Sequence, residues 1–424
     1  MKRNLFLTLF LSLATTVCAE TIWTGEKSFS TSWGDFEPIA KEGFAAAEVG
    51  DRLVFTVKDV AMEGWPQIQL NNSGWTLLLG AGSTLLSATT TSVEYVLTSL
   101  MLHELKNGGL ILSGAGYTLT AVDINAGTSA AELGNAVWIG ESPIDWSAGV
   151  SKWATIDASC FACAKAGDVI RLNCKDVQGG AQGGILKSDW NLMPGTEYVS
   201  IAGDCYEFTI TADMLAAMKD KGMIVSGIGY TLASIDIYAN VAISEAGLAT
   251  LCLPFNAAVP EGVSVYTLGS PEGTNVKATK VASCSVIPAG EGVIVSGTAG
   301  QTYTFLATSD APAALGTNTL IGVVRGATAG ANDYAFTTAS GKPVFAKIKD
   351  GTAIPSRKAY YSAGISEVAA QLTITLADGT TTAIDAVNAA GRQNAAAMYG
   401  IGGERVGASH RGLVIANGRK FINK

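Results

Sequence analysis

Tryptophan and side-chain amides stand close together in one stretch of the sequence. Trp65 is followed by Gln67 and Gln69, and Asn72 and Trp75 come shortly afterwards. Flat aromatic rings stack on the apolar C–H side of a sugar ring, and amides exchange hydrogen bonds with its hydroxyl groups. The combination therefore predicts a carbohydrate-binding surface formed by these five residues.

Part of this set returns later in the chain. Gln182 and Trp190 repeat it, whereas Gly180 stands where Trp65 does. We add Gln182 and Trp190 to the predicted binding residues. The alternative for Trp75 and Trp190 is a core position that the fold requires twice. Four further tryptophans recur in pairs, expected in the core for Trp23 with Trp138 and in loops for Trp33 with Trp146.

Recurring aspartates raise the alternative of glycoside hydrolysis by paired carboxylates. Asp51 corresponds to Asp168, and Asp123 corresponds to Asp236. An aspartate that follows glycine at the start of a strand is more often a turn residue bonded to nearby backbone. We therefore predict no catalytic residues and no enzymatic activity.

The cysteines leave several interpretations open. Four of them fall in the second copy: Cys160, Cys163, Cys174 and Cys205. Four thiolates suit zinc, but Cys174 replaces the core residue Val57, which favours buried thiols or a disulfide in an exported protein. Cys252 and Cys284 are a second candidate pair. We predict no metal centre and no cofactor, and leave open a structural Ca²⁺ ion, although no oxygen-ligand loop is visible.

The composition excludes several classes of protein. Charged residues make up 15% of the 424 residues and glycine contributes 49, which is typical of a turn-rich β protein. The formal charge is −8, and −10 once Lys2 and Arg3 are removed, so nucleic acid would be a poor partner. His103 and His410 are the only histidines, so a histidine-dependent triad has at most one candidate base. We expect His103 on the exposed side of a short helix.

An internal duplication organises the first half of the chain. The motif Trp-x-Gly at 23–25 returns at 138–140, and Ser-Gly-x-Gly-Tyr-Thr-Leu at 113–119 returns at 226–232. Between these motifs, apolar residues alternate with polar ones, the pattern of half-buried strands. Such self-similarity predicts one fold built twice.

Each copy is predicted to be a jelly-roll β-sandwich with one short helix, over 20–126 and 136–240. Thr98 and Thr211 are suited to cap the two helices, which we expect to run to residues 106 and 219. Copies of this kind, many short strands with turn signals between them, place the chain in the all-β class.

The remaining segments are assigned by composition. Residues 1–19 have the charged, apolar and small-residue regions of a signal peptide, with lipidation of Cys18 as an alternative. Strands and turns without the repeat predict a β-sandwich domain over 242–376, followed by a linker over 377–397 and a small β module over 398–424. No later apolar run is long enough to span a membrane.

The motifs resemble those of extracellular Bacteroidetes proteins. The duplicated region is similar to jelly-roll modules attached to glycan-degrading enzymes, and 242–364 resembles a β domain of secreted proteins from the same group. The segment Met398–Val406, followed by Arg411–Lys420, resembles the C-terminal sorting module read by the type IX secretion system, from which it departs at Ile401, Arg411 and Val414. The resemblance implies export and surface retention, near surface-anchored glycan-degrading enzymes.

These observations predict a secreted, non-catalytic protein that binds poly- or oligosaccharide at the cell surface. The rival interpretations are a structural adhesin or surface scaffold that binds protein partners, and a hydrolase whose active site has no recognisable motif. Binding would rest on outward-facing indoles, so burial of every tryptophan in both copies would exclude it.

Overall fold

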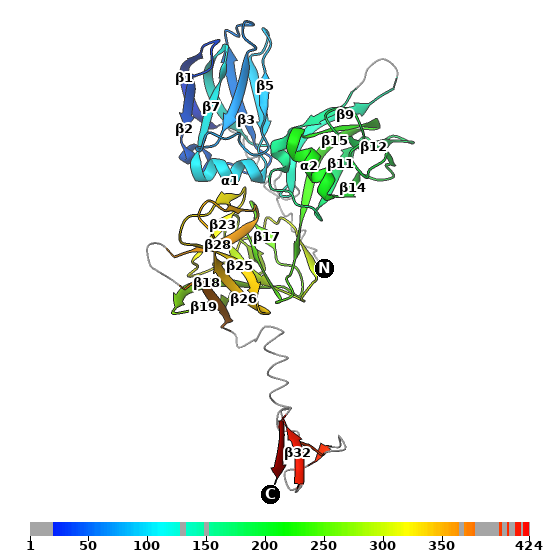
Figure 1. Ribbon diagram of the computed structural model, residues 1–424. Coiled ribbons are helices and arrows are strands. Elements are labelled where there is room, and N and C mark those ends of the chain that lie inside the picture. The colour runs from blue at the N-terminus through cyan, green and yellow to red at the C-terminus, as the bar shows by residue number, and fades with distance from the viewer. Residues whose placement is uncertain are drawn as a thin grey trace, which may run out of the picture. The chain divides into compact units, whose positions relative to one another are not determined.

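The computed structural model describes residues 20–127, 133–147, 152–363 and 369–377, and the backbone of four strands between 398 and 423 (Figure 1). Within this part of the chain nearly all regular structure is β, which confirms the predicted class. The backbone divides into two compact units. The first holds residues 1–161, 171–207 and 216–236, and the second holds 162–170, 208–215 and 237–424.

Copy one is a jelly roll, as predicted, and its eight strands form two sheets in the orders β1-β8-β3-β6 and β2-β7-β4-β5. The first sheet contains β1 (Glu20–Phe29), β8 (Tyr117–Asn125), β3 (Arg52–Lys58) and β6 (Ser92–Val96). The second contains β2 (Phe36–Ile39), β7 (Leu110–Ala115), β4 (Gln67–Asn71) and β5 (Ser83–Leu85). Leu53, Phe55 and Val57 point into the core between the sheets, as their alternation along β3 predicts.

Copy two repeats this topology with its last two strands fused. Its strands are β9 (Ala136–Asp145), β10 (Ala154–Ile156), β11 (Val169–Lys175), β12 (Gln182–Leu186), β13 (Val199–Ser200), β14 (Cys205–Thr209) and β15 (Met223–Ala242). The start of β15 pairs with β10 and β12, as β7 does with β2 and β4, and its later part pairs with β9 and β11, as β8 does with β1 and β3. The duplication seen in the sequence is therefore a duplication of strand order.

The helices begin at the predicted caps. The Thr98 hydroxyl accepts a hydrogen bond from Met101 N at 3.3 Å before α1 (Ser99–Gly108), and the Thr211 hydroxyl accepts one from Met214 N at 3.2 Å before α2 (Ala212–Lys221). Each helix runs two residues further than predicted. His103 is half-buried instead of exposed, and this burial lowers the pKa of His103.

The recurrent Ser-Gly-x-Gly-Tyr motif marks a close approach of two backbones. A Cβ atom on Gly114 would collide with the carbonyl oxygen of Gln67, and one on Gly227 would collide with that of Gln182. Both glycines also have positive φ, 145° and 155°. No other residue type fits at these two positions. Gly114 lets β7 lie close to β4, and Gly227 lets β15 lie close to β12.

The Trp-x-Gly motif has a different cause. The indoles of Trp23 and Trp138 lie over Gly25 and Gly140, where a Cβ would be 3.3 Å and 2.6 Å from the ring. Trp23 packs against the core and its Nε1 donates to Glu37 Oε1 at 3.0 Å. This tryptophan pair is half-buried, close to the predicted core position.

The third β region belongs to the second unit. Its nine-stranded sheet has the order β16-β21-β18-β19-β29-β26-β25-β28-β23, in which β19 and β29 are parallel. The strands are β16 (Leu248–Leu251), β18 (Ser264–Glu272), β19 (Asn275–Lys280), β21 (Val293–Ser296), β23 (Leu320–Val323), β25 (Asp333–Ala339), β26 (Lys342–Lys347), β28 (Lys358–Ser362) and β29 (Gln371–Leu376). Beside it, β22 (Thr302–Phe305) pairs with the end of β15, and two ribbons form from β17 (Ala257–Ala258) with β20 (Val286–Ile287) and β24 (Ala327–Thr328) with β27 (Ala353–Ile354).

The terminal module is also β. Strands β30 (Met398–Gly400), β31 (Arg405–Val406), β32 (Gly412–Ala416) and β33 (Arg419–Asn423) form one antiparallel sheet in the order β31-β30-β32-β33. The predicted signal peptide lies outside the described residues, and so does the predicted linker apart from residue 377.

Candidate carbohydrate-binding faces

Three tryptophans of the predicted site are well exposed to solvent. The exposed fractions are 76% for Trp65, 55% for Trp75 and 50% for Trp190. All three have a left-handed backbone, with φ of 61°, 60° and 67°. A bulky residue rarely adopts this conformation, so the loops hold each indole outward at a cost in strain.

Trp75 and Trp190 occupy the same position of the same hairpin loop. Trp75 N donates to Asn72 O at 3.0 Å and Asn72 N donates to Thr76 O at 2.8 Å, while Trp190 N donates to Lys187 O at 3.0 Å. This is a three-residue loop whose last residue is left-handed, a position that usually takes glycine. Strain of this kind costs about 1–3 kcal/mol and gathers at functional sites.

Each of these indoles meets a second aromatic ring at nearly a right angle. Phe36 and Trp75 have centroids 4.9 Å apart at 78°, and Trp153 and Trp190 have centroids 4.9 Å apart at 82°. Phe36 precedes Trp153 by 117 positions, within the offset of the duplication. The aromatic pair was therefore duplicated together with the fold, and both members of each pair are exposed.

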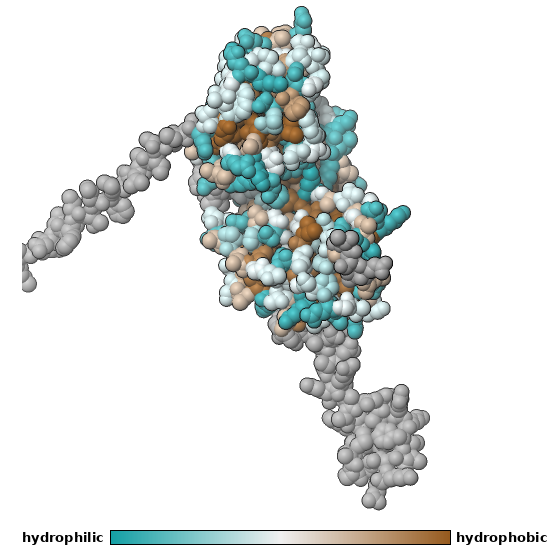
Figure 2. Space-filling view, turned by 90° about the vertical axis from the view of Figure 1, so that its left-hand side faces the viewer, coloured by the Kyte–Doolittle hydropathy of each residue, from teal (hydrophilic) through white to brown (hydrophobic). Residues whose placement is uncertain are grey.

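The amides of copy one lie on the same sheet face as its aromatic pair. Ser113 of β7 stands opposite both Phe36 and Gln69, and opposite residues of antiparallel strands point to one side. Gln67 lies two residues from Gln69 and shares that side. On the molecular face in Figure 2, hydrophobic residues lie in patches among hydrophilic ones. By this register, the outer face of the sheet combines the rings of Phe36 and Trp75 with the amides of Gln67 and Gln69.

Two predicted residues have different surroundings. The Asn72 side-chain oxygen accepts from Gly74 N at 3.0 Å and from the Thr76 hydroxyl at 3.0 Å, so Asn72 shapes the hairpin that carries Trp75. Trp65 lies at the opposite end of β4 from Trp75, separated by a strand of about 14 Å. Gln67, Gln69 and Trp75 therefore share one face, with Trp75 at one end of β4 and Trp65 beyond Gln67 at the other.

Two of the four recurring aspartates, Asp51 and Asp168, accept hydrogen bonds from backbone N–H groups. Asp51 and Asp168 each accept from the N–H three residues earlier at 2.8 Å. Their other oxygens accept from Gly127 N at 3.1 Å and Asn240 N at 3.0 Å, respectively. This is the turn role expected from Gly-Asp, and it gives these carboxylates a structural task.

The cysteines of the described residues are free thiols: Cys160, Cys163, Cys174, Cys205, Cys252 and Cys284. Of the two interpretations left open, buried thiols agree with the structure at Cys160, Cys163 and Cys174, and none of the candidate disulfides forms among the described residues. Burial raises the pKa of Cys160, Cys174 and Cys252 to about 12. Among the described residues, no three or more His, Cys, Asp or Glu side chains are grouped so that they could hold a metal ion.

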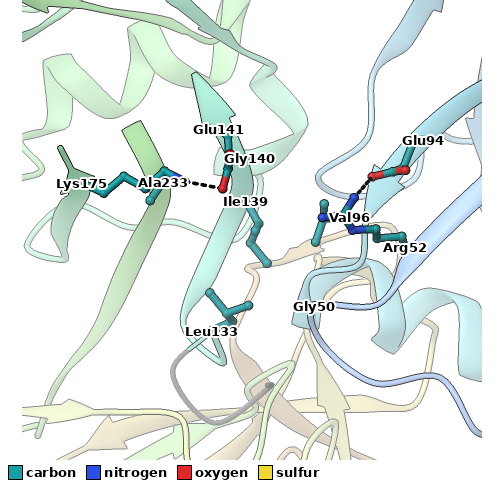
Figure 3. Close-up of a pocket in the computed structure, with 10 residues that line it drawn as sticks. All are labelled: Gly50, Arg52, Glu94, Val96, Leu133, Ile139, Gly140, Glu141, Lys175 and Ala233. Atoms are coloured by element: carbon teal, nitrogen blue, oxygen red, sulfur yellow. Dashed lines mark hydrogen bonds and ion pairs between the residues drawn. The ribbon is translucent and has the colours of Figure 1, made fainter. Parts of the chain in front are cut away.

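One cavity of about 490 Å³ lies within the first unit, and Figure 3 shows its lining. An ion pair between Arg52 and Glu94 (3.0 Å) lines one side, and a second between Lys175 and Glu141 lines the other. None of its ten described lining residues is aromatic. It therefore offers no stacking platform, and the outer sheet faces remain the candidate site.

Sequence reasoning missed Phe36, Trp153 and Tyr198. The first two could have been found by aligning the copies, because an offset of 117 pairs them. Tyr198 gave no signal of this kind, because its counterpart in copy one is Ser83, which is not aromatic. Only the strand register shows that the two positions correspond. Among the described residues no helix has the length and apolar character needed to cross a membrane.

Comparisons with known proteins give no family. No family model matches the chain, and no curated protein does. Among solved structures, SGBP-B of the Bacteroides ovatus mixed-linkage glucan utilization locus, in complex with a mixed-linkage heptasaccharide, is 23% identical over 25% of this chain and 28% of its own, with a TM-score of 0.22. The N-terminal CBM22-1–CBM22-2 tandem domain of Paenibacillus barcinonensis Xyn10C is 9% identical over 53% of this chain and 99% of its own, with a TM-score of 0.16. These likenesses are too slight to inform the ligand.

Proposed function

We propose that this chain is a secreted, non-catalytic protein that binds poly- or oligosaccharides through the outer sheet faces of its two jelly rolls. The observation that carries the proposal is the duplicated hairpin in which a strained, exposed tryptophan meets a second aromatic ring. If the residue at this position served folding alone, glycine would fit the left-handed backbone with less strain than tryptophan does. Gln67 and Gln182 supply hydrogen-bonding groups beside the rings in both copies.

The expected affinity is modest. At about 0.3 kcal/mol per heavy atom, a disaccharide gains about 7 kcal/mol, which is a dissociation constant of tens of micromolar or somewhat less. Two faces engaging one polymer would raise the apparent affinity by about 10²–10⁴-fold. The predicted signal peptide and the terminal segment that resembles a sorting module support the proposal that binding takes place outside the cell.

The test compares the full chain with its Trp75→Gly/Trp190→Gly variant on polysaccharide affinity gels and by calorimetry with oligosaccharides. Glycine suits the left-handed position, so the variant is expected to keep its melting temperature and lose retardation on the gel. A Trp23→Ala variant, altered at a core-packed indole, serves as the matched control and should bind as the parent does. If the parent binds no glycan, the protein-binding scaffold becomes the better explanation.

A further inference from the structure

The two copies differ at the centre of the outer sheet face. In copy one, Gln69 on β4 stands opposite Ser83 on β5. In copy two the same strand position holds Gly184. Gly183 of β12 pairs with Val199 of β13, so the register places Tyr198 opposite Gly184. An amide and a hydroxyl in one copy are thus replaced by an aromatic ring over bare backbone in the other.

Gly184 is the residue that lets this ring lie down on the sheet. A Cβ atom there would be 2.5 Å from the Tyr198 ring, which no packed side chain tolerates. Tyr198 in turn meets Trp146 edge-on, with centroids 4.7 Å apart at 89°. Trp146 is itself anchored, because its backbone N–H donates to Gly227 O at 3.0 Å.

Copy two therefore presents four aromatic rings on one face, as two edge-to-face pairs. Ala154 pairs with Val225, so Trp153, one residue earlier, stands opposite Ser226. Ser226 also pairs with Gly184, and Trp153 and Gly184 therefore lie on the same side of the sheet. The four rings remain 36–50% exposed. At about 200 Å² per ring this leaves roughly 350 Å² of aromatic surface.

That area fits a short ligand. A stable protein partner covers about 800 Å² on each side, more than twice what the rings offer, whereas two or three sugar rings are of matching size. Beside the face, Lys187 forms an ion pair with Asp189 at 2.8 Å, and Lys152 lies opposite Asp145 in an isolated backbone bridge. Each of these lysines has an aspartate beside it, which disfavours a polyanionic chain and favours an uncharged glycan.

Resting on the proposed function, we infer that copy two is the dominant binding face and takes uncharged sugar chains whose rings have all hydroxyls equatorial. Such rings carry axial C–H groups on both sides and stack without a protruding hydroxyl. Copy one has one aromatic pair, Phe36 with Trp75, and the amides of Gln67 and Gln69, while Trp33 and Trp65 are exposed in loops outside that pair. It binds the same chain more weakly, chiefly through hydrogen bonds. The duplication has thus produced two faces of unequal strength.

The experiment exchanges the differing residues in the full chain. The Gly184→Gln/Tyr198→Ser variant gives copy two the side chains of copy one, and the Gln69→Gly/Ser83→Tyr variant does the reverse. Calorimetry uses β-1,4-linked glucose and xylose hexasaccharides, with a mannose hexasaccharide and a galacturonate hexasaccharide for comparison. We expect the first variant to bind the glucose chain about tenfold more weakly and the second to bind it more tightly.

Several results would overturn this inference and leave the proposed function standing. They are an unchanged affinity in both exchange variants while the Trp75→Gly/Trp190→Gly variant loses binding, or tighter binding of mannose or galacturonate than of glucose and xylose by the parent. A proline-rich peptide that binds more tightly than every sugar would overturn it together with the proposed function. So would a parent that binds none of the four oligosaccharides.

Discussion

Asp168 and Arg357, 189 positions apart in the chain, form an ion pair that is closed to solvent. Nη2 of Arg357 donates to Oδ1 of Asp168 at 2.9 Å, with side-chain exposures of 6% and 0%. The same carboxylate also accepts two backbone hydrogen bonds, as Asp51 does in copy one. One turn residue of the duplicated fold has therefore acquired an additional task in the second unit.

This pair predicts an unequal cost of substitution. Arg357→Ala would leave a buried carboxylate without its cation, and breaking such a pair costs about 3–5 kcal/mol. Asp51→Ala, which removes the more accessible counterpart, should cost about 1 kcal/mol. Denaturant unfolding of both variants checks the difference, and an Arg357→Ala variant no less stable than Asp51→Ala would contradict it.

Because the hairpin tryptophans are strained and exposed, we expect that replacing one of them weakens glycan binding with little effect on the free energy of unfolding. Trp190→Gly relieves a left-handed tryptophan but adds unfolded-state entropy and loses one ring contact, so the free energy of unfolding should change by less than about 1 kcal/mol. Trp23→Ala removes a half-buried indole packed on the core and should cost about 2 kcal/mol. Thermal unfolding ranks the two, and the prediction fails if Trp190→Gly is the more damaging.

The close backbone approach predicts an intolerant glycine. Gly227→Ala would force a methyl group into Gln182 O at a φ of 155°, so we expect a loss of at least about 3 kcal/mol. Gly203 has nothing within 4 Å of its Cβ position, and Gly203→Ala should change stability by about 0.5 kcal/mol or less. Equal melting temperatures for the two variants would refute the assignment.

Binding should be nearly independent of pH between 4 and 8. The proposed contacts use rings and amides, and the acid nearest Trp190 is Asp189, whose pKa is lowered to about 2 by its hydrogen bond from Lys187 and by that from Asn191. A lowered pKa means that the ionised form is favoured in the folded hairpin, so its support is present at neutral pH and lost only as pH falls through about 4 towards 2. Calorimetry across this range tests it, and a tenfold change near pH 6 would point to a titrating group at the site.

Much of the fold could be predicted from the sequence because both local and long-range signals agreed. The alternation at Leu53, Phe55 and Val57 fixed the side of β3 that is buried, and Thr98 marked a helix start that the structure confirms. The motif offsets predicted that the fold occurs twice. These signals depend on the spacing of apolar residues along the chain, which determines whether a side chain points to the core or to solvent.

The candidate site was predictable only in part. The exposure of Trp65 agrees with its place between Gly64 and Pro66, which are typical of a loop. The contact of Phe36 with Trp75 depends on where a hairpin folds back across a sheet, and the position of Tyr198 depends on strand register. Asn72 has the residue type of a sugar ligand, yet its hydrogen bonds are used within the loop. The sequence shows which groups are available, whereas pairing between strands decides which of them meet.

The bare backbone at Gly184 has a consequence for how the two copies can diverge. A ring rests there because one atom is missing, and the supporting strand keeps the path it follows in copy one. A new ligand preference can therefore arise from exchanges at two facing positions, while the strands keep their register. Two β-sandwiches of this design can therefore differ in the sugars that they bind while both keep the same fold.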